Sequence, residues 1–481
     1  MPAHEFLNEQ QSSAPRPAAG PFKRSSMTSS KVAAASPSLD AGVDQPRPKL
    51  SVLDGVSMMV GIVIGIGIFK TPSLVAMNVG SEMGFLGLWL AGGVITLVGA
   101  MVYAELASAH PSTGGEYHFL SIGLGRPIGL LFAWARISVI QTGAIAAVAF
   151  VFGDYAQQLL ELGPYGQSIY AALAIVVFTG VNVAGASPST RVQHVFTVLT
   201  VVAILALVVF GLSASVAPVT PPPTTASSVT PAAGLALVFI LLTYGGWNEA
   251  AYLSAELRDP KRSMGRVLLI GTLIIVAVYL LVNLSMLRVL GLEGLRQSSA
   301  VGADLMRAAI GPSGALLVSG FVCFAALSTL NATIFTGARV YHAVGVDVPM
   351  VRRLGVWDSP HATPTNALLM QSAIALALVG FGAVTRDGFQ AMVDYTAPVF
   401  WFFLLLVGIS YFKLRTDASS GGFRAPLYPI TPLIFCLTCA YLLYSSLAYT
   451  GLGSLVGIAV LAAGIPLVIV ALRSAADPSR G

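Results

Sequence analysis

The stretch GIVIGIGIFKTP, at residues 61–72, places glycines two and four residues apart in the middle of an apolar run that extends from about 51 to 78. A second run, at about 232–257, contains LLTYGGWNE at residues 241–249, where a glycine pair precedes polar side chains. A helix broken inside a membrane exposes backbone groups that can bind an anion, an ammonium group or a cation. Two such breaks, at corresponding positions of two halves, predict a transporter substrate site. The alternative is that both glycine pairs only allow close helix packing.

The composition places the chain in a lipid bilayer. Hydrophobic residues make up 55% of the 481 residues and charged residues only 10%, compared with about 25% charged residues in soluble domains. A soluble protein of this size could not cover its surface with so few charges. This excludes a cytosolic enzyme, a disordered scaffold and an ordinary nucleic-acid-binding protein. We therefore expect the lipid bilayer as a partner and no nucleic acid.

Apolar runs near the ~20 residues that cross a bilayer recur along the chain. Backbone polar groups must be satisfied within lipid, so these continuous runs predict helices rather than a barrel. The predicted fold class is an all-α polytopic membrane protein with twelve transmembrane helices. We expect them at about 51–78, 84–108, 127–156, 167–184, 191–212, 232–257, 265–290, 312–344, 364–383, 389–413, 431–449 and 452–472.

The distribution of Lys and Arg predicts the topology. Residues 1–49 are rich in Ser, Ala and Pro and lack hydrophobic periodicity, which predicts a disordered tail. Lys and Arg are concentrated in this tail and in alternate loops, such as residues 258–266. By the positive-inside rule the tail and both termini are cytoplasmic, in a multi-pass chain of the inner or plasma membrane.

Three stretches together resemble the amino acid–polyamine–organocation (APC) superfamily, and within it the L-type amino acid transporters and their bacterial relatives. They are GIVIGIGIFKTP at 61–72, YAELASAHPSTGGEYHFL at 103–120 and YGGWNEAAYLSAELRDPKR at 244–262. The resemblance covers about residues 50–475. It implies two inverted five-helix repeats, at 50–212 and 232–413, and two peripheral helices at 431–472.

The resemblance also implies where an amino acid substrate binds. Backbone N–H groups of the first break would hold its carboxylate, and carbonyls of both breaks would hold its ammonium group. The N–H groups would be those of Gly65, Ile66 and Gly67, and the carbonyls those around Ile62, Val63, Thr243 and Tyr244. The substrate side chain would extend toward Gly245, next to Gly246, and toward the third, eighth and tenth spans.

Three positions depart from the pattern of these relatives. Ile66 stands where many relatives have Ser, so a hydroxyl is missing at the first break. Leu242 occupies the position at which relatives of the L-type often have an aromatic gate residue. We expect Trp247 to cover the substrate instead. Thr200 stands in the fifth span where many relatives have a Lys.

Ionisable residues within or near the spans need a reason, because a charge at the membrane centre costs about 2.5–3.5 kcal/mol. Glu105 and Glu116 flank the segment after the second span, either near an inner gate or as solvated loop acids. Arg136 lies deep in the third span and should pair with carbonyls or an acid, for which Glu105 and Asp394 are candidates. Lys70 follows the first break and either snorkels outward or meets the substrate carboxylate.

Neither a metal site nor a cofactor is expected. Cys436 and Cys439 form a C-x-x-C within an apolar run, which indicates small residues on a membrane helix rather than a redox site. The histidines, among them His118, His194 and His342, show no pair with metal-ligand spacing. We infer no obligate protein partner.

The function predicted from these features is a secondary active amino acid transporter that works by alternating access, and not an enzyme. Apart from Glu249, no acid lies beside either break, so a neutral amino acid is favoured over a cationic amino acid or a polyamine. Polytopic enzymes need an acid pair, H-E-x-x-H or Ser/His constellation, and the sequence shows none. An ion channel is the other alternative from a different class.

The sequence also bears on coupling. Ser328 and Thr329 on the eighth span could supply hydroxyls to a sodium site with carbonyls of the first break. No carboxylate compensates such a cation, and the resembling L-type branch is largely sodium-independent, so we expect sodium-independent transport. The remaining modes are exchange of one amino acid for another, or proton coupling through Glu105, Glu116 or Asp394.

Overall fold

The computed structural model describes residues 50–112, 114–185, 190–214, 232–347, 349–358, 363–385, 387–415, 422–449 and 451–476. Within these ranges the regular structure is helical, and the β-type pairings there are two isolated bridges, Leu50 with Leu257 and Asp358 with Thr363. The all-α prediction is confirmed. The tail predicted at 1–49 lies outside the described residues.

The helical elements of the described residues follow one another along the chain. In chain order they are α1 (Val52–Val63), η1 (Ile66–Phe69), α2 (Thr71–Met77), α3 (Glu82–Ala109), α4 (Gly115–Leu124), α5 (Arg126–Ala135), η2 (Arg136–Ile140), α6 (Gln141–Leu159), α7 (Gly166–Val183), α8 (Thr190–Ser213), α9 (Ala233–Thr243), η3 (Trp247–Glu256), α10 (Pro260–Gln297), α11 (Val301–Ile310), α12 (Pro312–Asp347), η4 (Pro349–Gly355), α13 (Thr365–Ala383), α14 (Gly388–Leu414), α15 (Ile430–Ala448) and α16 (Leu452–Ala476). Here η1, η3 and η4 are 3-10 helices and η2 is a π-helical turn.

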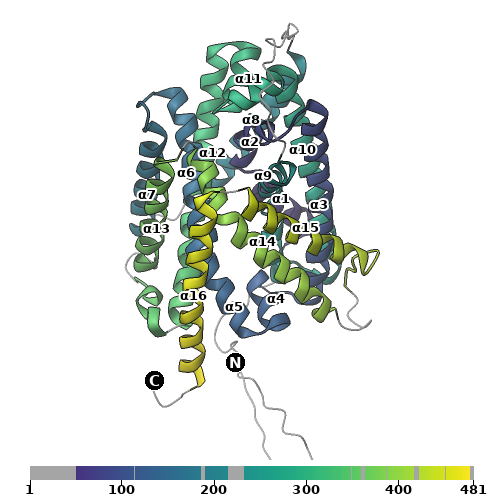
Figure 1. Ribbon diagram of the computed structural model, residues 1–481, viewed down its shortest axis with the longest axis vertical. Helices are drawn as coiled ribbons and strands as arrows, with labels where there is room; N and C mark the ends of the chain where they lie inside the picture. Colours follow the sequence, from purple (N-terminus) through teal and green to yellow (C-terminus); the bar gives the residue numbers. More distant parts are fainter. Residues whose placement is uncertain are drawn as a thin grey trace, which may run out of the picture. The chain divides into compact units, whose positions relative to one another are not determined.

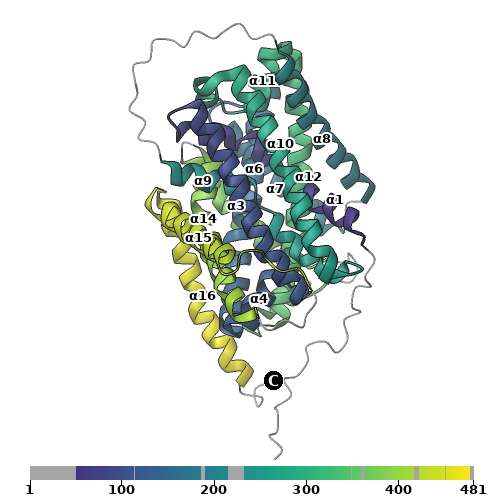
Figure 2. The same cartoon turned by 90° about the vertical axis from the view of Figure 1, so that its right-hand side faces the viewer.

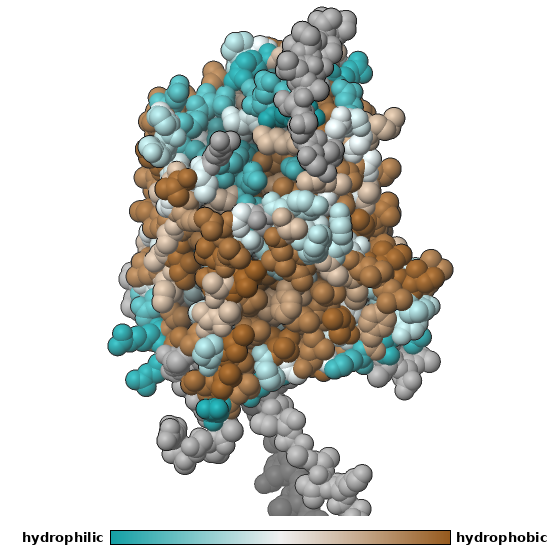
Figure 3. Space-filling model, in the orientation of Figure 1, coloured by the Kyte–Doolittle hydropathy of each residue, from teal (hydrophilic) through white to brown (hydrophobic). Residues whose placement is uncertain are grey.

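Ten segments within the described ranges are long and apolar enough to cross a membrane. They are α1 with η1, α3, α5 through α6, α7, α10, α12, α13, α14, α15 and α16. Figure 3 shows broad hydrophobic areas on the face it presents, with hydrophilic residues gathered toward its upper and lower ends. The chain is therefore a multi-pass membrane protein.

Two predicted spans take another form. The run at 191–212 falls in α8, whose apolar part in the described residues is Leu199–Ser213. The run at 232–257 is divided between α9 and η3, because the glycine pair interrupts it. With 11 residues, α9 is about half as long as the ~20 residues of a straight span.

Short polar side chains set several helix starts. Ser51 caps α1 in a capping box with Asp54, and Ser81 caps α3. Asp259 caps α10, and Asp387 caps α14 by accepting a hydrogen bond from the amide of Gln390. These side chains satisfy backbone N–H groups that have no partner inside the helix. Asp387 has a second role, described below, that depends on this fixed position.

The helices pack closely where small residues face a neighbour. α3 lies along α10, as Figures 1 and 2 show, while α6 packs on α12 and α14 on α15. A side chain at Gly99 of α3 would place its Cβ 2.7 Å from the ring of Trp247, so glycine is required for η3 to approach α3. Close approach through small residues is expected where no hydrophobic effect draws helices together.

Candidate functional site

The first apolar run loses its α-helical geometry at Ile64, directly before the glycines. α1 ends at Val63, Ile64 takes φ −70° and ψ 72°, and the chain continues as a 3-10 turn in η1 before α2. The carbonyl of Val63 accepts hydrogen bonds from the amide of Gly65 at 2.6 Å and from the hydroxyl of Tyr279 at 2.7 Å. The predicted helix break is present, and α10 supports it through Tyr279.

The second run breaks at its glycine pair. α9 ends at Thr243, and Gly246 adopts φ 100°, a left-handed conformation that residues with side chains rarely take. A Cβ at Gly246 would also lie 3.3 Å from Ile62 and 3.4 Å from Val63. At Gly245 a Cβ would lie 2.8 Å from the carbonyl oxygen of Leu242. Both glycines are therefore required by the backbone, and Gly246 lies against the first break.

Two threonines connect the breaks. The hydroxyl of Thr243 donates a hydrogen bond to that of Thr71 at 2.7 Å, and Thr71 in turn donates to the carbonyl of Gly67 at 2.7 Å. A Cβ at Gly67 would lie 3.4 Å from Thr243, which is ordinary contact, so only a larger side chain would intrude between the breaks. The backbones of both breaks are thus near enough to contact one small ligand.

A cavity of ≈ 230 Å³ lies beside the first break. Its lining includes Gly65 and Ile66 from the break, Thr200 from α8, and Ser328 and Thr329 from α12. The structure therefore brings together the hydroxyl residues that the sequence predicts around a sodium position. Carboxylates are absent from the lining that the structure describes.

The large side chains of the second break point into the helix bundle. Tyr244 is fully buried, and its hydroxyl donates to the carbonyl of Trp89 at 3.3 Å. The ring of Trp247 lies 4.9 Å from that of Tyr103 and 6.5 Å from that of Phe435, measured between centroids. The role of Trp247 as a gate over the substrate stays a prediction.

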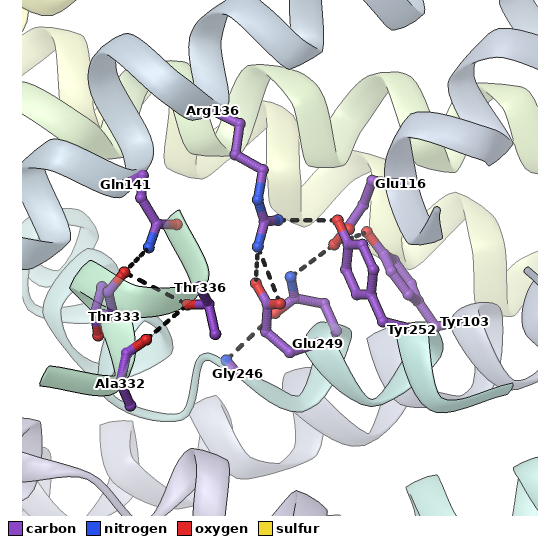
Figure 4. A network of polar contacts seen from close by, with 11 residues as sticks. Tyr103, Glu116, Arg136, Gln141, Gly246, Glu249, Tyr252, Ala332, Thr333 and Thr336 are labelled. Carbon is purple, nitrogen blue, oxygen red and sulfur yellow. Dashed lines mark hydrogen bonds and ion pairs between the residues drawn. The ribbon is translucent and has the colours of Figure 1, made fainter. Parts of the chain in front are cut away.

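A polar network joins the third span to η3, shown in Figure 4. Arg136 donates hydrogen bonds to both carboxylate oxygens of Glu249, at 3.0 and 3.1 Å, and to the hydroxyl of Tyr252 at 2.9 Å. The guanidinium also lies 5.1 Å from the centre of the Tyr252 ring. The expectation that Glu105 or Asp394 pairs with Arg136 is wrong, because the break turns η3 so that Glu249 faces it.

The turn that carries Arg136 is π-helical. Its wider geometry directs the carbonyls of Ile137 and Ser138 out of the helix, where they accept hydrogen bonds from the hydroxyls of Tyr341 and Tyr395. Such π-bulges occur frequently at functional sites. Tyr341 belongs to α12 and Tyr395 to α14, so this turn fixes three helices beside the ion pair.

Glu116 extends the network toward α4. It is 2% exposed, and one of its oxygens accepts a hydrogen bond from the side-chain amide of Asn248 at 2.7 Å. Burial and the neighbouring charge of Glu249 raise the pKa of Glu116, and Arg136 opposes this. The interpretation of Glu116 as a solvated loop acid is wrong.

Glu105 and Asp394 lie elsewhere. Glu105 is 7% exposed, and its carboxylate accepts hydrogen bonds from the hydroxyl of Tyr411 at 2.5 Å and the amide of Ala425 at 2.8 Å. It also lies 3.4 Å from the guanidinium of Arg415, so it fastens α3 to the end of α14 rather than facing solvent. Asp394 lies on α14 next to Gly453 at the start of α16.

Lys70 forms a second charged cluster, and the snorkelling interpretation is wrong. The side chain is 2% exposed, and its ammonium group lies 2.9 Å from Asp154 and 2.7 Å from Asp387. The other carboxylate oxygen of Asp387 caps α14, as described above, and Asp154 accepts a hydrogen bond from Gln167 at 2.6 Å. The cluster joins η1, α6 and α14 just beyond the first break.

The sequence did not reveal several residues around the breaks. Tyr252, Asn248 and Tyr279 are uncharged, and nothing in their spacing marks them as part of a site. The aspartates that hold Lys70 lie at span ends, where an acid is unremarkable in sequence. Glu249 was marked only by its position after the second glycine pair.

The sequence is similar to one family model and to several known proteins. The sequence model of one family, described as amino acid permease, matches residues 50–472. The b(0,+)-type amino acid transporter 1 of Homo sapiens is 27% identical over 406 residues, covering 82% of this chain and 82% of its own length. The large neutral amino acids transporter small subunit 2 of Rattus norvegicus is 27% identical over 432 residues, covering 88% and 80%. The cystine/glutamate transporter of Homo sapiens is 24% identical over 433 residues, covering 88% and 85%.

The family match covers the region from the start of α1 into α16, including both breaks and both charged clusters. It agrees with the resemblance that the three stretches of sequence indicate. The chain belongs to the amino acid permease family, and it is an amino acid transporter rather than an enzyme.

Proposed function

We propose that this permease is a secondary active carrier for neutral amino acids that works by alternating access. The observation that carries the proposal is the contact between two broken helices, where Gly246 lies against Ile62 and Val63. Broken helices that meet inside a bundle leave backbone groups to bind both ends of an amino acid. A channel does not require two broken helices that bind a substrate. Unitary currents from the reconstituted chain would favour the channel alternative.

The proposed architecture has twelve spans in two inverted repeats. Ten segments of the described residues qualify as spans, and we assign α8 and the α9–η3 pair as the fifth and sixth spans. Each proposed repeat then begins with a helix that changes to 3-10 geometry, α1 into η1 and α9 into η3. The last two spans, α15 and α16, are the peripheral pair. The protein lies in the inner or plasma membrane, and both termini are on its cytoplasmic side.

The substrate in this proposal lies between the breaks. N–H groups around Gly65, Ile66 and Gly67 bind its carboxylate, and carbonyls around Val63 and Thr243 bind its ammonium group. Glu249 is the acid nearest the second break, and it is already paired with Arg136. A cationic substrate side chain therefore lacks a carboxylate of its own, which favours a neutral one.

Two charged clusters provide the seals that alternating access needs. Lys70 with its two aspartates closes the side toward α2 and α11, and Arg136 with Glu249 closes the side toward α4. Both clusters use the same long helix, α5 through α6, as one wall. Opening one seal while the other stays closed gives the substrate access to one side at a time.

We propose that transport does not depend on sodium. The cavity with Thr200, Ser328 and Thr329 offers hydroxyls but no carboxylate in its described lining, so a bound cation would stay uncompensated. For proton coupling, Glu116 is the favoured group, because Glu105 is held by Arg415 and Asp394 faces α16. Exchange of one amino acid for another is the other mode. Uptake that collapses when choline replaces sodium would contradict this proposal.

The direct test is a panel of radiolabelled neutral, cationic and polyamine substrates, taken up by vesicles that contain the purified chain alone. Saturable uptake of neutral amino acids supports the proposal, and preference for cations or polyamines contradicts it. One relative is by its name a small subunit. Uptake by the chain without another protein tests our proposal that no obligate partner is needed.

Variants at the breaks test the site itself. Gly67→Leu and Gly245→Leu should each abolish uptake, because a large side chain would stand between the breaks or against the carbonyl of Leu242. Gly87→Leu is the matched control, since a Cβ at Gly87 meets nothing within 4 Å. Equal amounts of the three variants in the membrane would show that insertion is intact. Normal uptake by both break variants would overturn the site assignment.

A further inference from the structure

A second and larger cavity, of ≈ 690 Å³, lies apart from the cavity beside the first break. Its walls come from α4, α5, η2, η3, α12, η4, α13 and α16, and one end reaches the Arg136 network. Neither α1 nor α8 contributes to its described lining, so it is separate from the cavity beside the first break. Its volume is within the range of small-molecule pockets, ~300–1,000 Å³.

The cavity opens toward the lipid-facing surface. Met370 of α13 lines it and is also 49% exposed. On the opposite wall, Leu467 and Val468 of α16 line it, next to Ile469, which is 45% exposed. Figure 1 shows α13 and α16 on the same face of the bundle, with α12 between them. A hydrocarbon chain could enter between these two helices without crossing water.

The end of the same cavity formed by α12 and η4, which the proposed topology places on the cytoplasmic side, is positively charged. Arg339 of α12 lines the cavity, donates one hydrogen bond to the carbonyl of Phe335, and forms no ion pair within the described part of the chain. A guanidinium has five N–H donors, so most remain for a ligand. Val351 and Leu354 of η4 line the cavity as well, and Arg352 and Arg353 between them are on the surface. Glu249, the acid in the lining, is bound by Arg136.

We propose that this cavity binds an anionic phospholipid. One acyl chain lies against the apolar lining between α13 and α16, and the phosphate is bound by Arg339, with Arg352 and Arg353 near the headgroup. Basic pockets between helices at the cytoplasmic side are suited to anionic headgroups. An apolar space that opens to lipid and ends at a guanidinium matches an amphiphilic anion better than a soluble one. Because one end of the cavity is the Arg136 network, the bound lipid would contact the helices that the pair of Arg136 and Glu249 joins.

Trp134 provides a reporter, since it lines the cavity. The full-length purified chain in neutral detergent is titrated with phosphatidylglycerol, or with phosphatidylcholine, that carries bromine on its acyl chains, and tryptophan quenching is followed. We expect quenching by phosphatidylglycerol at a much lower mole fraction than by phosphatidylcholine. Trp134→Phe should remove this component and leave the quenching of other tryptophans.

Charge and volume variants separate the parts of the proposal. Arg339→Gln should raise the half-saturating amount of phosphatidylglycerol about tenfold, the loss expected for one charge-assisted hydrogen bond. Arg473→Gln is the matched control, because Arg473 is exposed on α16 and is absent from the lining. Ala133→Phe keeps every arginine and narrows the cavity. In this variant the brominated lipid should no longer quench Trp134.

Three results would overturn the proposal. The first is equal quenching by the two lipids in the unmodified chain. The second is an Arg339→Gln variant that behaves like Arg473→Gln. The third is displacement of the brominated lipid by millimolar inorganic phosphate, which would identify a site for free anions instead. None of these readouts requires transport, so they are independent of the proposed substrate and coupling.

Discussion

Replacing Arg136 by alanine should destabilise the protein, and its partner Glu249 should be the cause. In the intact network, one guanidinium serves both oxygens of Glu249 and the hydroxyl of Tyr252. Arg136→Ala removes these three hydrogen bonds and leaves Glu249 and Glu116 in a partly buried region without a cation. The destabilisation therefore arises from carboxylates left behind, as well as from lost contacts.

The magnitude follows from the burial of the pair. Breaking a fully buried ion pair costs about 3–5 kcal/mol, whereas an exposed pair contributes about 0–1 kcal/mol. The side chains of Arg136 and Glu249 are 16% and 36% exposed, which places this pair between the two limits. We expect Arg136→Ala to lower the free energy of unfolding by about 2–3 kcal/mol.

A double-mutant cycle isolates the interaction. Thermal unfolding in detergent is measured for Arg136→Ala, Glu249→Gln and the double variant, with Arg136→Lys to test the charge without the fork-shaped guanidinium. The double variant should unfold at a higher temperature than Arg136→Ala alone, because it lacks the orphaned carboxylate of Glu249. If the fall in its unfolding temperature equals the sum of the falls in the two single variants, Arg136 and Glu249 contribute to stability independently. That result would refute the reasoning.

Other predictions concern the second cluster, Glu116 and the ions in solution. Lys70→Met should destabilise the protein by about 3–5 kcal/mol, because two aspartates would face each other in a buried region. Adding Asp154→Asn to this variant should restore part of the lost thermal stability. If it restores none, the proposed role of the cluster is contradicted. Because the pKa of Glu116 is raised above 4.5 in the folded chain, the carboxyl binds its proton more tightly there than when unfolded. Stability should thus fall as pH rises from the unfolded pKa through the folded one, and Glu116→Gln should show a smaller fall in melting temperature over that window. Replacing sodium by choline should leave uptake unchanged, and a collapse would point to Ser328 and Thr329.

The sequence predicted best what depends on composition and on glycine. Long apolar runs must be helical in lipid, so the helices could be placed without knowledge of their neighbours. The breaks were also visible, because φ 100° at Gly246 and the close contact at Gly245 leave little choice but glycine. Such constraints involve residues that are close in the sequence, so they can be recognised from the local sequence.

Pairing across the bundle could not be predicted in the same way. Arg136 and Glu249 are 113 residues apart, and which acid faces Arg136 depends on the direction that η3 takes after the break. Lys70 illustrates the same difficulty, since a lysine near a span end usually snorkels to water. Whether it does so here was decided by Asp154 and Asp387, which come from helices far along the chain. The packing of Trp247 against Tyr103 and Phe435 likewise leaves no trace in the sequence.

The π-helical turn at Arg136–Ile140 begins at Arg136 and precedes Asp154 in the third span. A π-turn accommodates one residue more than an α-turn, so the extra residue is taken up within the turn. Deleting one residue there would restore a regular helix and leave the helix beyond it facing nearly the same way, so that Asp154 still faced Lys70. The deletion would instead remove the outward direction of the carbonyls of Ile137 and Ser138, which bind Tyr341 and Tyr395. The extra residue therefore allows one continuous helix to offer backbone acceptors to two neighbouring helices while its two ends keep their own partners.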